Sequence, residues 1–197
     1  MRTPLILAVA LVLATAPAAA QQKPPAPPAA PQPAVPSPYA GENLLVKMPD
    51  GYKVGFSTQK DSLTLVQMVP QAESVQGWTE MVTVQIFAGM KADPAAFKTS
   101  VITSWGLSCA GASAHPIAEK TENGYRALVW MLTCPRNAKS GKPEWTWFKS
   151  IAGNDSFYVV QKAFRFEPSK EQVTRWTTYL SDVMVCDNRT KERRCKK

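Results

Sequence analysis

Apolar and polar residues alternate along several stretches of the chain, most clearly from Trp78 to Ala88. Within it, Val82, Val84 and Ile86 point to one side and their neighbours point to the other. A period of two is typical of a β-strand with one face in a core. Further strands are predicted at 44–48, 52–58, 62–69, 116–120, 125–133, 145–151 and 157–166.

After Ala92 the apolar residues recur about every four positions. Asp93 can cap a helix there and Pro94 suits its first turn. The apolar stripe consists of Phe97, Val101, Ile102 and Trp105. This pattern predicts an amphipathic helix with Trp105 buried against the sheet.

A second helix is predicted to begin after Ser169, because Gln172 three residues later completes a capping box. Trp176 is its largest predicted core residue. The whole buried stripe is predicted to be Val173, Trp176, Leu180, Val183 and Met184.

Short turns separate the later strands. Asn123-Gly124 favours a two-residue hairpin, and Gly153 to Asp155 marks another. Hairpins join antiparallel strands. The predicted fold class is therefore α+β, with a mainly antiparallel sheet covered by two amphipathic helices.

The N-terminal residues predict export. Arg2 precedes an apolar run from Leu5 to Ala16, and the small residues Ala18 to Ala20 follow. This layout is that of a cleaved signal peptide at 1–20, because a membrane-spanning helix needs about 20 apolar residues. We therefore predict a periplasmic or secreted protein that begins at Gln21.

Composition divides the remaining chain into three parts. Residues 21–39 form a Pro/Ala-rich linker, with eight prolines between Lys23 and Pro38. Residues 40–186 are long enough for one domain with a core. Residues 187–197 are predicted to be a basic C-terminal tail.

All four cysteines fall at or beyond the predicted end of the first helix. In an exported chain an even number of cysteines indicates disulfides. Of the three pairings, we predict Cys109–Cys134, which joins the first helix to a strand, and Cys186–Cys195, which closes a short loop.

Two sequence segments, 76–85 (QGWTEMVTVQ) and 157–165 (FYVVQKAFR), resemble segments of uncharacterised exported proteobacterial proteins. The order of elements also resembles the PsbP-like fold. That resemblance implies a binding or assembly protein, because such folds mostly have these roles. No functional residue of those families matches a position of this chain.

Catalytic and metal-binding patterns are weak. His115 is the single histidine and could be imagined as a base for Cys109 or Cys134, but oxidised cysteines are the favoured interpretation. Glu80 is expected to form a structural ion pair with Arg126 or Arg165. We predict no catalytic residue, no metal site and no cofactor.

The aromatic and methionine side chains are also better interpreted as core residues than as ligand-binding residues. Trp145 and Trp147 share a strand face and could stack on sugars, although core packing is favoured. Met81 and Met90 are not arranged as copper ligands and are interpreted as core residues.

Charge gives the remaining functional signal. The formal net charge is +8, and the predicted tail is rich in basic residues. Basic surfaces attract anions such as phospholipid headgroups or acidic proteins. The candidate anion-binding residues are Arg189, Lys191, Arg193 and Arg194.

These observations predict a non-enzymatic binding module for an envelope protein or an anionic surface component, with peripheral membrane contact. The compartment argues against a nucleic-acid partner. The alternatives are an enzyme of unrecognised type, with a site of scattered residues, and a secreted virulence-associated factor. A basic end that only maintains solubility is an equal alternative for the tail.

Overall fold

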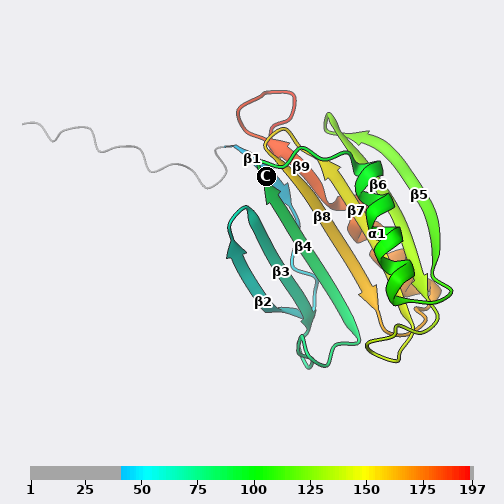
Figure 1. Ribbon diagram of the computed structural model, residues 1–197. Helices are drawn as coiled ribbons and strands as arrows, with labels where there is room; N and C mark the ends of the chain where they lie inside the picture. The colour runs from blue at the N-terminus through cyan, green and yellow to red at the C-terminus, as the bar shows by residue number, and fades with distance from the viewer. Residues whose placement is uncertain (1–40, 196–197) are drawn as a thin grey trace, which may run out of the picture. The chain divides into compact units, whose positions relative to one another are not determined.

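A computed structural model describes residues 41–195 (Figure 1). The predicted signal peptide (1–20) and linker (21–39) lie outside the described residues. The elements are β1 (Glu42–Leu45), β2 (Tyr52–Lys60), β3 (Leu63–Pro70), β4 (Glu80–Ala88), α1 (Pro94–Ser108), β5 (Ser113–Glu122), β6 (Tyr125–Cys134), β7 (Glu144–Ala152), β8 (Ser156–Phe164), α2 (Lys170–Asp182) and β9 (Met184–Asp187). The predicted α+β class is confirmed.

Seven strands form one antiparallel sheet in the order β2-β3-β4-β8-β7-β6-β5. Both predicted hairpins are present, and Asn123 and Gly124 take the positive φ angles of 49° and 78° that such a turn requires. β4 joins β8 at the centre of the sheet, and their paired residues lie 68 to 84 positions apart in the chain.

Helix α1 lies on one face of the sheet over β6 and β7 (Figure 1). Its cap is the one predicted, since the Asp93 carboxylate accepts a hydrogen bond from the Ala96 N–H. The residues that pack under it are Leu128, Trp130, Leu132 and Phe148, against Ala95, Phe97, Val101, Ile102 and Trp105. The predicted apolar stripe of α1 therefore does face the sheet. Trp105 was predicted to be buried, but it is only half-buried.

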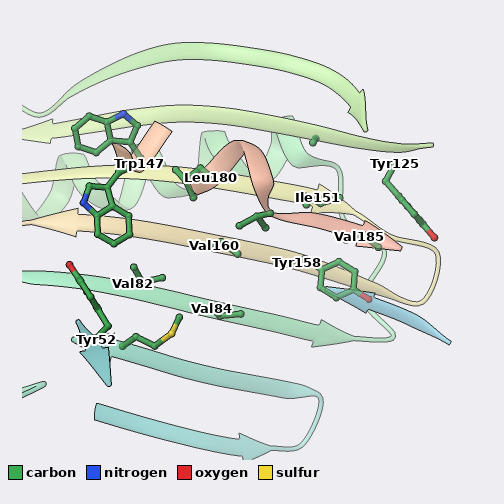
Figure 2. Packing of buried hydrophobic residues seen from close by; sticks show 14 of the residues in the cluster. Tyr52, Val82, Val84, Tyr125, Trp147, Ile151, Tyr158, Val160, Leu180 and Val185 are labelled. Atoms are coloured by element: carbon green, nitrogen blue, oxygen red, sulfur yellow. The ribbon is translucent and has the colours of Figure 1, made fainter. Parts of the chain in front are cut away.

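Helix α2 covers the opposite face together with β1 and β9, which pair antiparallel as a separate ribbon. Ser169 and Gln172 form the predicted capping box. Figure 2 shows the core on this side, where Leu180 of α2 and Val185 of β9 meet sheet residues such as Trp147, Ile151 and Val160. Trp176 is buried as predicted.

The predicted buried stripe of α2 was wrong at its last residue, Met184. Val183 is buried, but Met184 begins β9 and is exposed, because a strand turns alternate residues outward where a helix would not. β9 was not predicted, since its four residues carry too short a pattern to recognise. Among the described residues, no helix is long and apolar enough to cross a membrane.

Both disulfides have the predicted pairing. Cys109–Cys134 joins the end of α1 to the end of β6, and Cys186–Cys195 closes a loop after β9. No cysteine of residues 41–195 is free. Two disulfides are more typical of a periplasmic or extracellular protein than of a cytoplasmic one.

Candidate functional site

The basic segment after Cys186 is a loop closed by the predicted Cys186–Cys195 disulfide and held at both ends by hydrogen bonds. The Asp187 N–H donates to the Arg193 carbonyl at 2.7 Å, and the Cys195 N–H donates to Asn188 Oδ1 at 3.1 Å. Asp187 is itself the last residue of β9 and is buried. We call residues 186–195 the disulfide loop.

Arg189 is occupied by acidic side chains within the protein. Its guanidinium donates to both carboxylate oxygens of Asp187, at 2.6–3.1 Å, and reaches Asp155 Oδ2 at 2.6 Å. These hydrogen bonds lower the pKa of Asp187 and raise the pKa of Arg189. The structure therefore gives this predicted anion ligand the role of fastening the loop to the β7–β8 turn.

Arg193 is also engaged. Its guanidinium lies 4.7 Å from the centre of the Tyr125 ring, and its carbonyl accepts from Asn123 Nδ2 at 3.1 Å. A side chain at Gly124 would lie within 2.8 Å of Arg193 Nε, so the hairpin glycine also makes room for this contact. The loop thus packs on the β5–β6 hairpin as well.

Lys191 and Arg194 are the two remaining candidates, and both are exposed. Neither makes an ion pair with any acidic residue between 41 and 195. Of the four predicted anion-binding residues, the structure therefore leaves these two available for an external anion.

A buried cationic cluster lies between the sheet and α2, and the sequence analysis did not identify it. Lys162 of β8 has no exposed surface, and its Nζ donates to Glu80 Oε2 and to the Tyr52 hydroxyl at 2.7 Å each. The same ammonium lies 3.8 Å from the centre of the Trp176 ring and 4.3 Å from that of Phe164. It is enclosed by aromatic rings and one carboxylate.

Burial dominates the acid–base properties of this cluster. It lowers the pKa of Lys162 to about 8, despite the opposing effect of Glu80. Burial and the Glu80 hydrogen bond raise the pKa of Tyr52. A lysine with such a pKa can act as a base or nucleophile, but Trp176 and the strands enclose its amine. The arrangement therefore fastens α2 to the sheet.

A second buried lysine holds the other end of α2. Lys149 Nζ donates to the carbonyls of Leu180 at 3.0 Å and Val183 at 2.6 Å, and it pairs with Glu122 at 2.5 Å. Burial lowers its pKa. A positive charge at a helix C-terminus is stabilising because the last carbonyls there lack helical partners.

The residues considered for catalysis do not form a thiol–histidine pair. Cys109 and Cys134 are joined in a disulfide, as was favoured, and His115 lies on the edge strand β5. Among residues 41–195, no group of three or more histidine, cysteine or acidic side chains could hold a metal ion.

The predicted partners of Glu80 were wrong, although a structural ion pair is present. Arg126 pairs with Asp93 and Glu119, and Arg165 stacks 3.8 Å from the centre of the Trp78 ring. The β4–β8 register places Val82 opposite Lys162, so Lys162 and Glu80 share one face at neighbouring positions. This register could not be read from either strand alone.

The remaining aromatic and methionine candidates are mostly core residues. Trp147 and Met81 are buried and Trp145 is partly buried, which agrees with core packing. Met90, by contrast, is exposed and was wrongly interpreted as core.

A groove of about 580 Å³ lies beside β1 and the end of α2. The Tyr179 hydroxyl donates to the Lys47 carbonyl at 2.7 Å, so this polar group is already used. The lining residues are Leu44, Leu45, Val46, Lys47, Tyr179, Asp182, Val183 and Met184.

Comparison with known proteins gave no match to a protein-family model and none to a curated protein.

Proposed function

We propose that this protein is a non-enzymatic binding module of the periplasm or extracellular space that binds an anionic component of the bacterial envelope. A PsbP-like relationship remains part of this proposal, supported by the order of strands and helices. The contact with the envelope is peripheral and electrostatic.

The disulfide loop is the observation that carries the proposal. It presents Lys191 and Arg194 to solvent, while Arg189 and Arg193 hold its backbone against two hairpins. A constrained loop loses less conformational entropy on binding than a free tail does. Anion affinity through exposed cations falls with salt, because the screening length shortens to about 8 Å at physiological ionic strength.

The test is sedimentation of the purified protein with vesicles of phosphatidylglycerol and phosphatidylcholine at low salt. The double variant Lys191→Gln, Arg194→Gln should bind roughly tenfold or more weakly, since each basic residue near an anionic surface contributes about 1 kcal/mol. Its melting temperature should be unchanged, because neither side chain makes an ion pair within residues 41–195.

The matched control is Lys139→Gln with Lys142→Gln, which removes the same charge from the exposed loop between β6 and β7. This control should retain vesicle binding within about twofold of the native protein. Equal sedimentation of the native protein and the disulfide-loop variant would show that the loop serves only solubility.

A further inference from the structure

The two edges of the seven-stranded sheet differ in how they resist pairing with another strand. β5 carries Pro116, a bulge between Pro116 and Ala118, and charged residues at its end. Proline, bulges and charges are the devices that protect edges. The edge at β5 is therefore blocked by its own sequence.

β2, at the opposite edge (Figure 1), carries a bulge and a lysine near each end but none of these devices between Phe56 and Gln59. It contains no proline, and its bulge lies between Val54 and Phe56, so Phe56–Lys60 runs in regular register with β3. No strand within residues 41–195 pairs with its outer side. Every second residue of such an edge turns its N–H and C=O outward.

Exposed apolar side chains lie on the same strand. Val54 is 50% and Phe56 43% exposed, although both residue types normally gain free energy from burial. An added strand would satisfy the outward backbone groups and cover both side chains in one step. The unpaired backbone edge thus identifies the geometry of the occupant as an extended peptide.

Charge identifies its composition. β2 carries Lys53 and Lys60 and no acidic residue, and the nearest carboxylates along the chain, Asp50 and Asp61, lie in the turns on either side of the strand. Lys53 Nζ donates to the Gln71 carbonyl at 2.7 Å, and Lys60 is exposed. An antiparallel pairing of two copies of β2, centred near Phe56, would bring Lys53 of one copy to the same end as Lys60 of the other. Like charges at both ends disfavour this dimer.

We infer that the edge of β2 binds an extended peptide segment of a partner protein, with acidic residues flanking an apolar centre. The segment adds a further strand to the sheet beside Phe56–Lys60. This surface is separate from the disulfide loop and does not depend on the proposed anion binding.

The test uses a labelled synthetic peptide of alternating valine and threonine with an aspartate at each end. Titration should shift the backbone NMR signals of 54–60 and slow amide exchange there, because added hydrogen bonds protect the edge. Methylation of alternate peptide nitrogens should abolish these effects. Shifts confined to β5 or to the disulfide loop would overturn the inference.

Substitutions test the side chains. Phe56→Lys should weaken peptide binding roughly tenfold. Ile117→Lys on β5 is the matched control, since Ile117 is 45% exposed, and it should change affinity less than about twofold. An equal effect of both variants would contradict the assignment to β2.

A second variant tests the charge. Lys53→Glu with Lys60→Glu should transfer the preference from the aspartate-flanked peptide to a lysine-flanked one. An unchanged preference would overturn the acidic occupant. The native protein could instead form concentration-dependent dimers that the Phe56→Lys variant does not form. That result would show that a second copy occupies the edge and would overturn the inference.

Discussion

At the scale of single residues, two buried lysines explain how α2 is held on the sheet. Lys162 lies against the Trp176 ring, and Lys149 donates to the carbonyls at the end of α2. Both share their strand face with buried apolar residues, namely Trp147 and Ile151 beside Lys149 and Val160 and Phe164 beside Lys162. Desolvation disfavours their charged forms, so each depends on its carboxylate partner, Glu80 or Glu122.

The lowered pKa of Lys162 predicts an unusual pH dependence of stability. Between its folded pKa of about 8 and the unfolded value of about 10.4, the unfolded chain binds more protons. The free energy of unfolding should therefore rise from pH 8 to pH 10, by about 2 kcal/mol for this group. Lys149 contributes in the same direction, because burial lowers its pKa too.

Buried tyrosines should end this rise in the free energy of unfolding above pH 10. Burial raises the pKa of Tyr179 to about 12, so above pH 10 the unfolded chain loses its phenolic proton first and stability falls. Urea unfolding at each pH measures the profile. Lys162→Met should reduce the rise, and Lys139→Met, at an exposed lysine, should preserve it. A flat native profile from pH 8 to pH 10 would contradict the buried lysine pKa.

These lysines also show what sequence reasoning overlooked. Lys162 falls on the same strand face as Val160 and Phe164, and a lone lysine within such an apolar alternation is a recognisable signal of a buried charge. Its partner was not recognisable. The pairing with Glu80 depends on the register between β4 and β8, which no local pattern specifies.

At the scale of elements, the two helices bury their aromatic residues to different extents. Trp176 is 2% exposed and contacts the Tyr52 and Tyr179 rings as well as Lys162. Trp105 of α1 is half-buried and lies edge-on to Phe148 at 6.1 Å. Of the two helix tryptophans, only Trp176 of α2 is therefore fully buried.

This difference predicts unequal costs of truncation. Trp176→Ala should lower the free energy of unfolding by about 3–5 kcal/mol, because it leaves a cavity and uncovers an ammonium group. Trp105→Ala should cost about half as much, since solvent already reaches the ring. Urea denaturation compares them, with Leu107→Ala at an 88% exposed site as the control. Equal losses for both tryptophan variants would show that the helices pack alike.

Local signals account for most of the elements that the sequence predicted. The Asp93 cap, the Ser169–Gln172 capping box and the Asn123-Gly124 turn each act within a few residues, and all three are present. β9 and its pairing with β1 depend instead on contacts across about 140 residues. The closure of the disulfide loop was predicted from its cysteine pair, but the Arg189 contact with Asp155 and the Arg193 contact with Tyr125 depend on such long-range packing as well.

At the scale of the whole molecule, disulfides secure opposite faces of the sheet. Cys109–Cys134 fixes α1 on one face, and Cys186–Cys195 closes the disulfide loop beyond the β1–β9 ribbon on the other. Both should therefore contribute to stability, but only Cys186–Cys195 should contribute to anion binding.

Serine variants of each pair separate these contributions. By the chain-entropy relation, opening Cys109–Cys134 should cost roughly 3.5 kcal/mol and opening Cys186–Cys195 roughly 2.7 kcal/mol, because the first closes a longer loop. Urea midpoints measure both losses. At a temperature where each variant is folded, only the Cys186→Ser, Cys195→Ser protein should bind anionic vesicles more weakly. Its loop keeps the Arg189 and Arg193 contacts but loses the covalent closure that restrains Lys191 and Arg194. Unchanged vesicle binding by this variant would show that the closure is irrelevant to recognition, and equal weakening in both pairs would show that sedimentation reports stability alone.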